Sequence, residues 1–335
     1  MSPPLPEPPD DLDPEHLAFV GAGFMAAKML CVAVDLGLFE HLADGPRTLD
    51  ELVTATGLPR RALRLVASGL AATGILDLED GRFANGRHAQ AFLAGRTSVD
   101  LRPGLRLYNH IIYPMWMGFE ETVRTGHPAR PPQKSEAFGR IFSEGVDAWT
   151  GVGARALPDR YDFSAHRRIL DVGGGTGSYL LPILDRHPEV RATLLDLPPS
   201  IAAARRRLAG EPARDRIELV EADALFDPLP EGHDLVIVAG FIHLFNPDKI
   251  ELVLSRIRAA VPAGARLLIV DQWMDDTHTK PVFGAMLAAT YLLLAGDGDT
   301  YSVSEAEPWL RAAGFRFLDR RQLSGVISVV VAEAQ

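Results

Sequence analysis

The stretch ILDVGGGTG at residues 169–177 decides the fold of the C-terminal half of this chain. A short apolar run leads directly into a glycine-rich turn, and a helical pattern begins at Ser178. Glycine lets a backbone approach a ligand closely, so such a turn after a buried strand predicts a nucleotide-type cofactor site. The glycines follow the spacing GxGxG, and Ser178 stands where the dinucleotide pattern GxGxxG requires glycine or alanine. This departure disfavours a nicotinamide-dependent dehydrogenase.

Short runs rich in leucine and β-branched residues surround this stretch and alternate with helical patterns from residue 166 onward. The runs cover residues 168–172, 192–195, 217–220, 235–238, 266–270 and 326–331. Strands separated by helices predict a parallel sheet with helices on both faces, which is a Rossmann-like, doubly wound α/β architecture.

Three acidic residues accompany the first three predicted strands. Asp171 lies within the quoted stretch, Asp196 ends the next strand, and Asp223 follows the third. A carboxylate at the end of the second strand can accept hydrogen bonds from both hydroxyls of a ribose. Asp223 is placed to accept one from the exocyclic amine of adenine. Acids in this order therefore fit a cationic adenosyl ligand.

The N-terminal part has the pattern of three helices followed by a hairpin, which predicts a winged helix. Thr48 and Glu51 form a capping-box pair at a helix start, and Asp80-Gly81 is a turn dipeptide between two short strand patterns. Four domains are expected: a disordered, proline-rich tail (1–14), a mainly helical winged-helix domain (15–100), a helical linker and substrate-pocket region (101–165), and a cofactor-binding domain (166–335).

The charge of the chain narrows its partners. It has 34 lysines and arginines against 44 aspartates and glutamates, a formal net charge of −10, which disfavours nucleic acid as a partner. Winged helices commonly bind DNA, and Arg60, Arg61 and Arg64 lie where a recognition helix would begin. A DNA-binding regulator that senses an adenosyl ligand is therefore the alternative from a different class.

The N-terminal sequence also predicts a location. The single cysteine, Cys31, cannot form an internal disulfide, and no secretory pattern is visible, so a cytoplasmic protein is expected. The apolar stretch 17–42 is interrupted by Lys28, Asp35 and Glu40. We expect it to be a buried helix, with no membrane association.

Several of these motifs together resemble one family. The run DVGGGTG, the DLP after the second strand, and the segment from Ile242-His243 to Asn246-Pro247-Asp248 resemble class I S-adenosylmethionine-dependent O-methyltransferases of the caffeate and acetylserotonin type. Residues 35–39 and 74–76 resemble the winged-helix dimerisation domain of that family. The resemblance implies S-adenosyl-L-methionine as cofactor, S-adenosyl-L-homocysteine as product, a homodimer, and a small aromatic or polyketide-like acceptor from secondary metabolism, such as antibiotic biosynthesis.

The resemblance also implies roles for the residues of the cofactor site. The turn holds the methionine moiety, Asp196 binds the ribose, and Asp223 lies beside the adenine. The cofactor-binding residues expected on this basis are Asp171, Gly173, Gly175, Gly177, Asp196, Leu197, Asp223, Ala224 and Ala239.

The catalytic histidine of the family falls on His243, and a supporting acid falls on Asp271. His243 follows the strand pattern at 235–238, at the sheet edge where ligands of open α/β folds bind. Histidine exchanges protons near neutral pH, so it can deprotonate a phenol as the methyl group arrives. From position alone, a histidine that merely caps the next helix is the alternative.

Two positions depart from the family pattern. Leu244 follows the histidine where plant members commonly have aspartate; a carbon-methylating branch uses that His-Asp pair in a metal site, so no metal site is expected. The second acid that flanks the histidine in plant enzymes falls on Thr300, with Asp299 as a neighbouring substitute. The alternative within enzymes is therefore a relative that binds the cofactor but catalyses hydroxylation, decarboxylation or ring rearrangement, or a C-methyltransferase.

The acceptor pocket is expected between the sheet edge and the helices of residues 100–150. Phe138 and Phe142 match aromatic or methionine positions that line the pocket in the family, and Thr300 lies at the second-acid position. Trp149, Met286 and Tyr291 are candidates by placement, and Trp116 and Met117 are weaker ones. Simple core packing is the competing interpretation for the apolar residues of this set.

Overall fold

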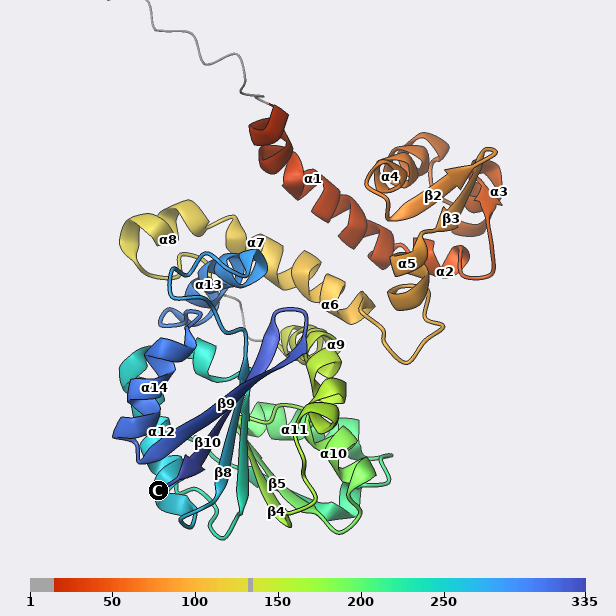
Figure 1. The fold of residues 1–335 in the computed structure, drawn as a ribbon. Helices are drawn as coiled ribbons and strands as arrows, with labels where there is room; N and C mark the ends of the chain where they lie inside the picture. The colour runs from red at the N-terminus through yellow and green to blue at the C-terminus, as the bar shows by residue number, and fades with distance from the viewer. Residues whose placement is uncertain (1–14, 132–134) are drawn as a thin grey trace, which may run out of the picture. The chain divides into compact units, whose positions relative to one another are not determined.

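The computed structural model describes residues 15–131 and 135–335, so the predicted N-terminal tail lies outside the described residues. The chain divides into two compact units, the first ending at Asn109 and the second beginning at His110 (Figure 1). The boundary falls inside the segment expected to be a linker and pocket region. Residues 101–109 belong to the first unit, whereas residues 110–165 belong to the second.

The first unit is mainly helical, with a small antiparallel sheet in the order β1-β3-β2. The capping box of Thr48 and Glu51 and the hairpin around Asp80-Gly81 are both present, which confirms those predictions. Its elements are α1 (Glu15–Asp35), α2 (Leu38–His41), β1 (Arg47–Thr48), α3 (Leu49–Thr56), α4 (Arg60–Ala72), β2 (Leu76–Glu79), β3 (Arg82–Asn85), α5 (Arg87–Phe92) and α6 (Arg102–Leu107).

Helix α1 corrects one expectation. It was expected to be buried, yet the side chains of Leu17 and Phe19 are 75% and 80% exposed, and burial is confined to Cys31, Ala33 and Val34. By length and apolar composition alone, α1 is also a helix that could cross a membrane, contrary to the inference drawn from its charges. An apolar pattern indicates that a face will be covered but does not say by what.

The second unit is built on a seven-stranded sheet in the order β6-β5-β4-β7-β8-β10-β9. Its strands are β4 (Arg168–Val172), β5 (Arg191–Asp196), β6 (Ile217–Glu221), β7 (Leu235–Ala239), β8 (Arg266–Asp271), β9 (Phe315–Ser324) and β10 (Ile327–Ala334). β6, β5, β4, β7 and β8 are parallel, as predicted. β10 is antiparallel to β8 and to β9, and β9 had no counterpart among the predicted strands.

Helices cover both faces of this sheet (Figure 1), which confirms the doubly wound α/β prediction. Leu170 and Val172 pack against α12 and α14, whereas Ile169, on the other face of the same strand, packs against α9, α10 and α11. The helices and short helical turns are η1 (Tyr108–Ile112), α7 (Tyr113–Trp116), α8 (Phe119–Thr125), α9 (Glu136–Arg160), α10 (Leu180–Arg186), α11 (Pro198–Leu208), η2 (Arg214–Arg216), η3 (Ile242–Leu244), α12 (Pro247–Ala260), α13 (Val282–Ala295) and α14 (Val303–Ala312).

Candidate active site

The glycine-rich turn lies at the topological switch point of the sheet. β4 is central, with β5 on one side and β7 on the other, and the chain crosses from one side to the other after β6. Ligands of open α/β sheets bind at the carboxyl ends of the strands at this point. Gly173 has a φ of 68°, and a Cβ there would collide with the ring of Phe241, which follows β7. The turn therefore forms a cradle that only glycine allows.

Asp171 is a buried acid behind this cradle. Its side chain is 1% exposed, and neither carboxylate oxygen has a hydrogen-bond partner within the described part of the chain. Burial, with a smaller contribution from the charge of Asp196, raises the pKa of Asp171 to about 8. A buried carboxyl group without partners fits a site completed by a cationic ligand, so the residues present fit S-adenosylmethionine.

Asp196, at the end of β5, is fixed by backbone donors. One carboxylate oxygen accepts a hydrogen bond from the Gly175 N–H at 2.8 Å, and the other accepts one from the Leu197 N–H at 2.7 Å. Burial raises the pKa of Asp196, while these two backbone hydrogen bonds lower it less. The turn and the second acid are therefore one hydrogen-bonded unit.

The remaining cofactor candidates lie near the ends of the next strands. Asp223 follows β6 and accepts a hydrogen bond from the Leu225 N–H at 2.9 Å, which orients its carboxylate. Ala224 is buried and Ala239, the last residue of β7, is half-buried.

Asp147 is a polar residue that sequence reasoning missed. It lies on α9 and accepts hydrogen bonds from two hydroxyls of the turn, Thr176 Oγ1 at 2.8 Å and Ser178 Oγ. Arg207 on α11 approaches the same carboxylate, with 3.8 Å between Nε and Oδ2. Ser178, the residue that breaks the dinucleotide pattern, thus has a defined role: it ties the turn to α9. No local signal reveals this contact, because the partners are about 30 residues apart in sequence.

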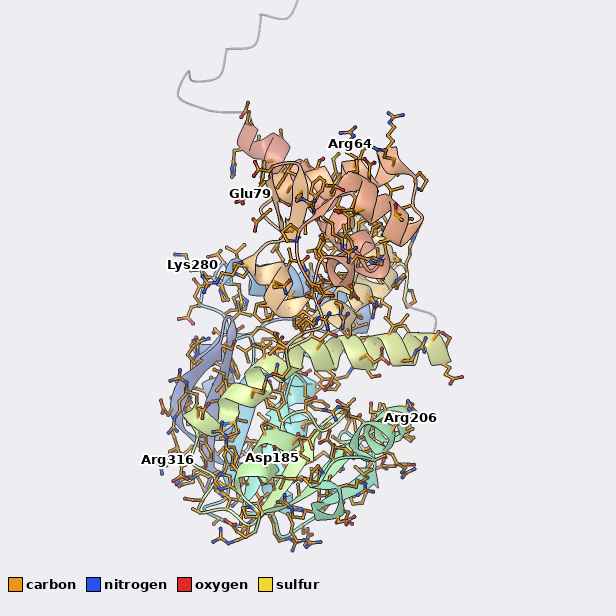
Figure 2. The ribbon with its side chains drawn as sticks, turned by 90° about the vertical axis from the view of Figure 1, so that its right-hand side faces the viewer. Arg64, Glu79, Asp185, Arg206, Lys280 and Arg316 are labelled. Carbon is orange, nitrogen blue, oxygen red and sulfur yellow. The ribbon has the colours of Figure 1, made fainter. Side chains whose placement is uncertain are left out.

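Asp147 also borders a polar cavity of about 710 Å³ between α9 and α11. Arg206, which projects from α11 (Figure 2), contributes to its wall, as does Thr176 of the turn. The other lining residues are Glu136, Ala137, Arg140, Ser143, Glu144, Ala203 and Arg207.

The structure brings His243 and Asp271 together, since they follow neighbouring parallel strands. His243 lies in η3 just after β7, and Asp271 is the last residue of β8. His243 Nδ1 is 2.8 Å from Asp271 Oδ1, and the side chains are 12% and 4% exposed. A carboxylate only accepts hydrogen bonds, so Nδ1 carries the hydrogen and Nε2 holds the lone pair. This is the geometry of a histidine base oriented by an acid.

The residues at the second-acid position do not supply a charge to this pair. Thr300 is 2% exposed, and its Oγ1 has no hydrogen-bond partner among the described residues. Asp299 accepts a hydrogen bond from the Thr300 N–H at 2.7 Å, and its own N–H donates to the His243 carbonyl at 3.0 Å. The Asp299 carboxylate is therefore directed at its own backbone.

The predicted acceptor-pocket residues fall in different environments. Phe138 and Phe142 stack on each other on α9, with ring centroids 5.5 Å apart, and Phe138 lines a cavity of about 430 Å³ with Ile111 and Met115. Trp149 is half-buried on α9, whereas Met286 on α13 is 54% exposed.

The helices around the predicted pocket are joined by polar contacts. Trp116 on α7 donates a hydrogen bond from Nε1 to Thr290 on α13 at 3.1 Å. Tyr291, the next residue, packs directly on His243. Within residues 15–131 and 135–335, no group of three or more histidine, cysteine or acidic side chains could hold a metal ion.

Comparison with known proteins follows the same division of the chain. An O-methyltransferase domain matches residues 111–316, and an O-methyltransferase dimerisation domain matches residues 20–95. The 3-hydroxy-5-methyl-1-naphthoate 3-O-methyltransferase of Streptomyces sahachiroi is 31% identical over 314 residues, which is 92% of this chain and 91% of that protein.

Solved structures agree with these matches. The S-adenosyl-L-methionine-dependent methyl transferase PigF of Serratia, solved with S-adenosylhomocysteine, is 26% identical, with a TM-score of 0.84 over 96% of this chain and 100% of that one. Human N-acetylserotonin methyltransferase, solved with S-adenosylmethionine, shares the fold with a TM-score of 0.86 at 22% identity over 97% of this chain and 99% of that one. The chain therefore belongs to the S-adenosylmethionine-dependent O-methyltransferase family.

Proposed function

We propose that this enzyme methylates an aromatic hydroxyl group of a small secondary metabolite, with His243 as the general base. The observation that carries the proposal is the 2.8 Å contact between His243 and Asp271 at the carboxyl edge of β7 and β8, two strands from the glycine-rich turn. The family and the naphthoate-methylating relative support an aromatic acceptor.

The cofactor residues have distinct tasks in this scheme. S-adenosylmethionine, when bound, supplies a methyl group on a sulfonium, which is already a good leaving group. The turn at Gly173, Gly175 and Gly177 admits the methionine moiety, and Asp171 supplies negative charge behind it. Asp196 accepts hydrogen bonds from the ribose and Asp223 accepts one from the adenine. Leu197, Ala224 and Ala239 complete the walls of this site.

The base acts at a defined atom. Asp271 holds the hydrogen of His243 on Nδ1, so Nε2 accepts the proton of the acceptor hydroxyl. The acceptor oxygen forms its bond to the methyl carbon as the bond from that carbon to sulfur breaks, and S-adenosylhomocysteine leaves. Asp271 then stabilises the imidazolium. Positioning supplies most of the acceleration, because the residues chiefly align the oxygen and exclude water.

The acceptor site consists of apolar side chains around this base. We assign Phe138, Phe142, Trp149, Met286 and Thr300 to it. Apolar walls select a flat aromatic molecule over a charged one. Labelled methyl transfer to a panel of phenols and hydroxylated polycyclic compounds tests the assignment, and an acceptor that is labelled only by the wild type, and not by Phe142→Ala, identifies the pocket.

We further propose a homodimer in the cytoplasm that binds neither nucleic acid nor membranes. The dimerisation-domain match includes most of α1, whose exposed apolar side chains require a cover. In the first unit, Arg60 is paired with Asp50 at 2.8 Å, which reduces the positive charge of the helix that would read DNA, while Arg64 projects outward (Figure 2). A gel shift at physiological salt tests this, and no shift is expected.

One observation favours a second candidate function. Thr300, buried and uncharged, leaves His243 with a single supporting acid. A relative that binds the cofactor without transferring its methyl group would tolerate this change. Substrate turnover without formation of S-adenosylhomocysteine would support that function and reject methyl transfer.

A further inference from the structure

Tyr291 lies face to face with the histidine. Its ring centroid is 3.8 Å from that of the His243 imidazole, and the two ring planes differ by 12°. Tyr291 lies on α13 and is 9% exposed, so the stack is inside the protein. An aromatic face carries negative potential and attracts a cation placed over it. The ring therefore both fixes the plane of the imidazole and stabilises its protonated form.

The hydroxyl of Tyr291 joins the same network from another direction. It donates a hydrogen bond to Gln272 Oε1 at 2.7 Å, and the Gln272 N–H donates to Asp271 Oδ1 at 2.9 Å. That oxygen is the one that lies 2.8 Å from His243 Nδ1. The contacts form a closed circuit: Asp271 holds the imidazole within its plane, and Tyr291 holds it across its plane.

The backbone around the stack leaves room for nothing larger. A Cβ at Gly298 would lie 2.6 Å from the His243 carbonyl oxygen and 2.8 Å from Tyr291 Cβ. Gly298 is therefore required for the close approach of the segment after α13 to η3. The chain thus spends a glycine on this contact, at the place where Thr300 supplies no charge.

We propose that Tyr291 is a positioning residue that takes the place of a second acid: its ring orients His243 Nε2 toward the acceptor oxygen and stabilises the imidazolium formed in the reaction. The inference rests on the proposed role of His243 as the base. It also changes the expected role of Tyr291 from a wall of the acceptor pocket to a support of the base.

Two substitutions separate the ring from its hydroxyl. Tyr291→Phe keeps the stack and removes the hydrogen bond to Gln272, so kcat is expected to stay within about threefold of wild type. Tyr291→Leu removes the ring, and a misplaced base lowers kcat by roughly 10- to 100-fold. The KM for the acceptor and the affinity for S-adenosylhomocysteine are expected to change by less than about threefold, because Tyr291 acts on the base.

A matched control lies elsewhere in the same unit. Tyr161 stacks on His166 with centroids 5.7 Å apart and an interplanar angle of 23°. Tyr161→Leu removes a comparable Tyr–His contact outside the site, so it reports the effect of lost packing alone. If it lowers kcat as much as Tyr291→Leu does, the proposal is overturned.

A double-mutant cycle and a spectrum keep this test separate from the proposed function. Tyr291→Leu should add no further loss in a His243→Ala background, because it acts through that histidine. In histidine-labelled protein, the His243 Hε1 resonance, assigned by its loss in His243→Ala, should move downfield in Tyr291→Leu and stay near its wild-type position in Tyr291→Phe.

The outcomes are distinct. Wild-type kcat in His243→Ala rejects the base and leaves the stack to be judged by the spectrum. A slow His243→Ala together with an unchanged kcat in Tyr291→Leu, or a rise in acceptor KM alone, overturns the positioning role of Tyr291.

Discussion

Replacing Asp171 with asparagine should stabilise the cofactor-free protein while it weakens cofactor binding. Asp171 is fully buried behind the glycine-rich turn, and neither of its carboxylate oxygens has a partner among the described residues. The site thus holds an acid whose charge is useful only when a cation is bound. Asparagine has nearly the same shape but cannot supply that charge.

The pKa of Asp171 sets the size of the effect. Burial raises it to about 8 from an ordinary value of 3.8. The folded protein therefore keeps a proton that the unfolded chain releases above pH 4, so stability falls as the pH rises from about 4 to about 8. At about 1.36 kcal/mol per pH unit, the full span corresponds to about 6 kcal/mol, of which about 4 kcal/mol is lost by pH 7. Asp171→Asn removes this loss.

Urea unfolding of the cofactor-free proteins measures it. The stability advantage of Asp171→Asn over wild type should grow by about 4 kcal/mol between pH 5 and pH 8, because other titrating groups cancel in the difference. Calorimetry with S-adenosylmethionine at pH 7.5 should show at least a tenfold loss of affinity in the variant. A stability difference that is constant with pH would refute the reasoning about Asp171, and wild-type affinity would refute its role in the cradle.

Three further predictions follow from other contacts. Asp271→Asn should lower kcat by about 100-fold with cofactor affinity within about twofold of wild type, because the imidazole loses its acceptor at Nδ1; steady-state kinetics that show an unchanged kcat would remove Asp271 from the mechanism. Asp147→Ala should weaken S-adenosylhomocysteine binding about tenfold by releasing two hydroxyls of the turn, whereas Asp185→Ala, an exposed acid on α10 (Figure 2), should not; equal calorimetric affinities of the two variants would contradict the contact. Phe19→Asp should shift light scattering toward monomer by burying a charge in the interface proposed for α1, and an unchanged dimer would place the interface elsewhere.

The core of the fold could be predicted because the sequence marks it locally. The stretch 169–177 combines a buried strand, its carboxyl end and a turn that needs glycine, and the later strands repeat a pattern with the same physical meaning. His243 and Asp271 were expected to be neighbours because adjacent parallel strands end at one edge, and they lie 2.8 Å apart.

Other features depend on partners that are distant in sequence. β9 carries Arg320, Arg321 and Gln322 and lies at the edge of the sheet, so its apolar alternation is weak and the strand was not predicted. Asp147 has its role only because α9 packs beside the turn. The exposed face of α1 has the pattern of a buried helix, because a sequence does not distinguish burial within one chain from burial against another.

Methyl transfer from labelled S-adenosylmethionine to a phenolic acceptor, with wild type and His243→Ala run side by side, tests the central claim most directly. The account predicts labelled product and stoichiometric S-adenosylhomocysteine from the wild type, and a loss of at least 100-fold in kcat for the variant, with cofactor affinity retained in both. Equal rates from the two proteins would contradict the role of His243, and acceptor turnover by the wild type without S-adenosylhomocysteine would contradict methyl transfer itself.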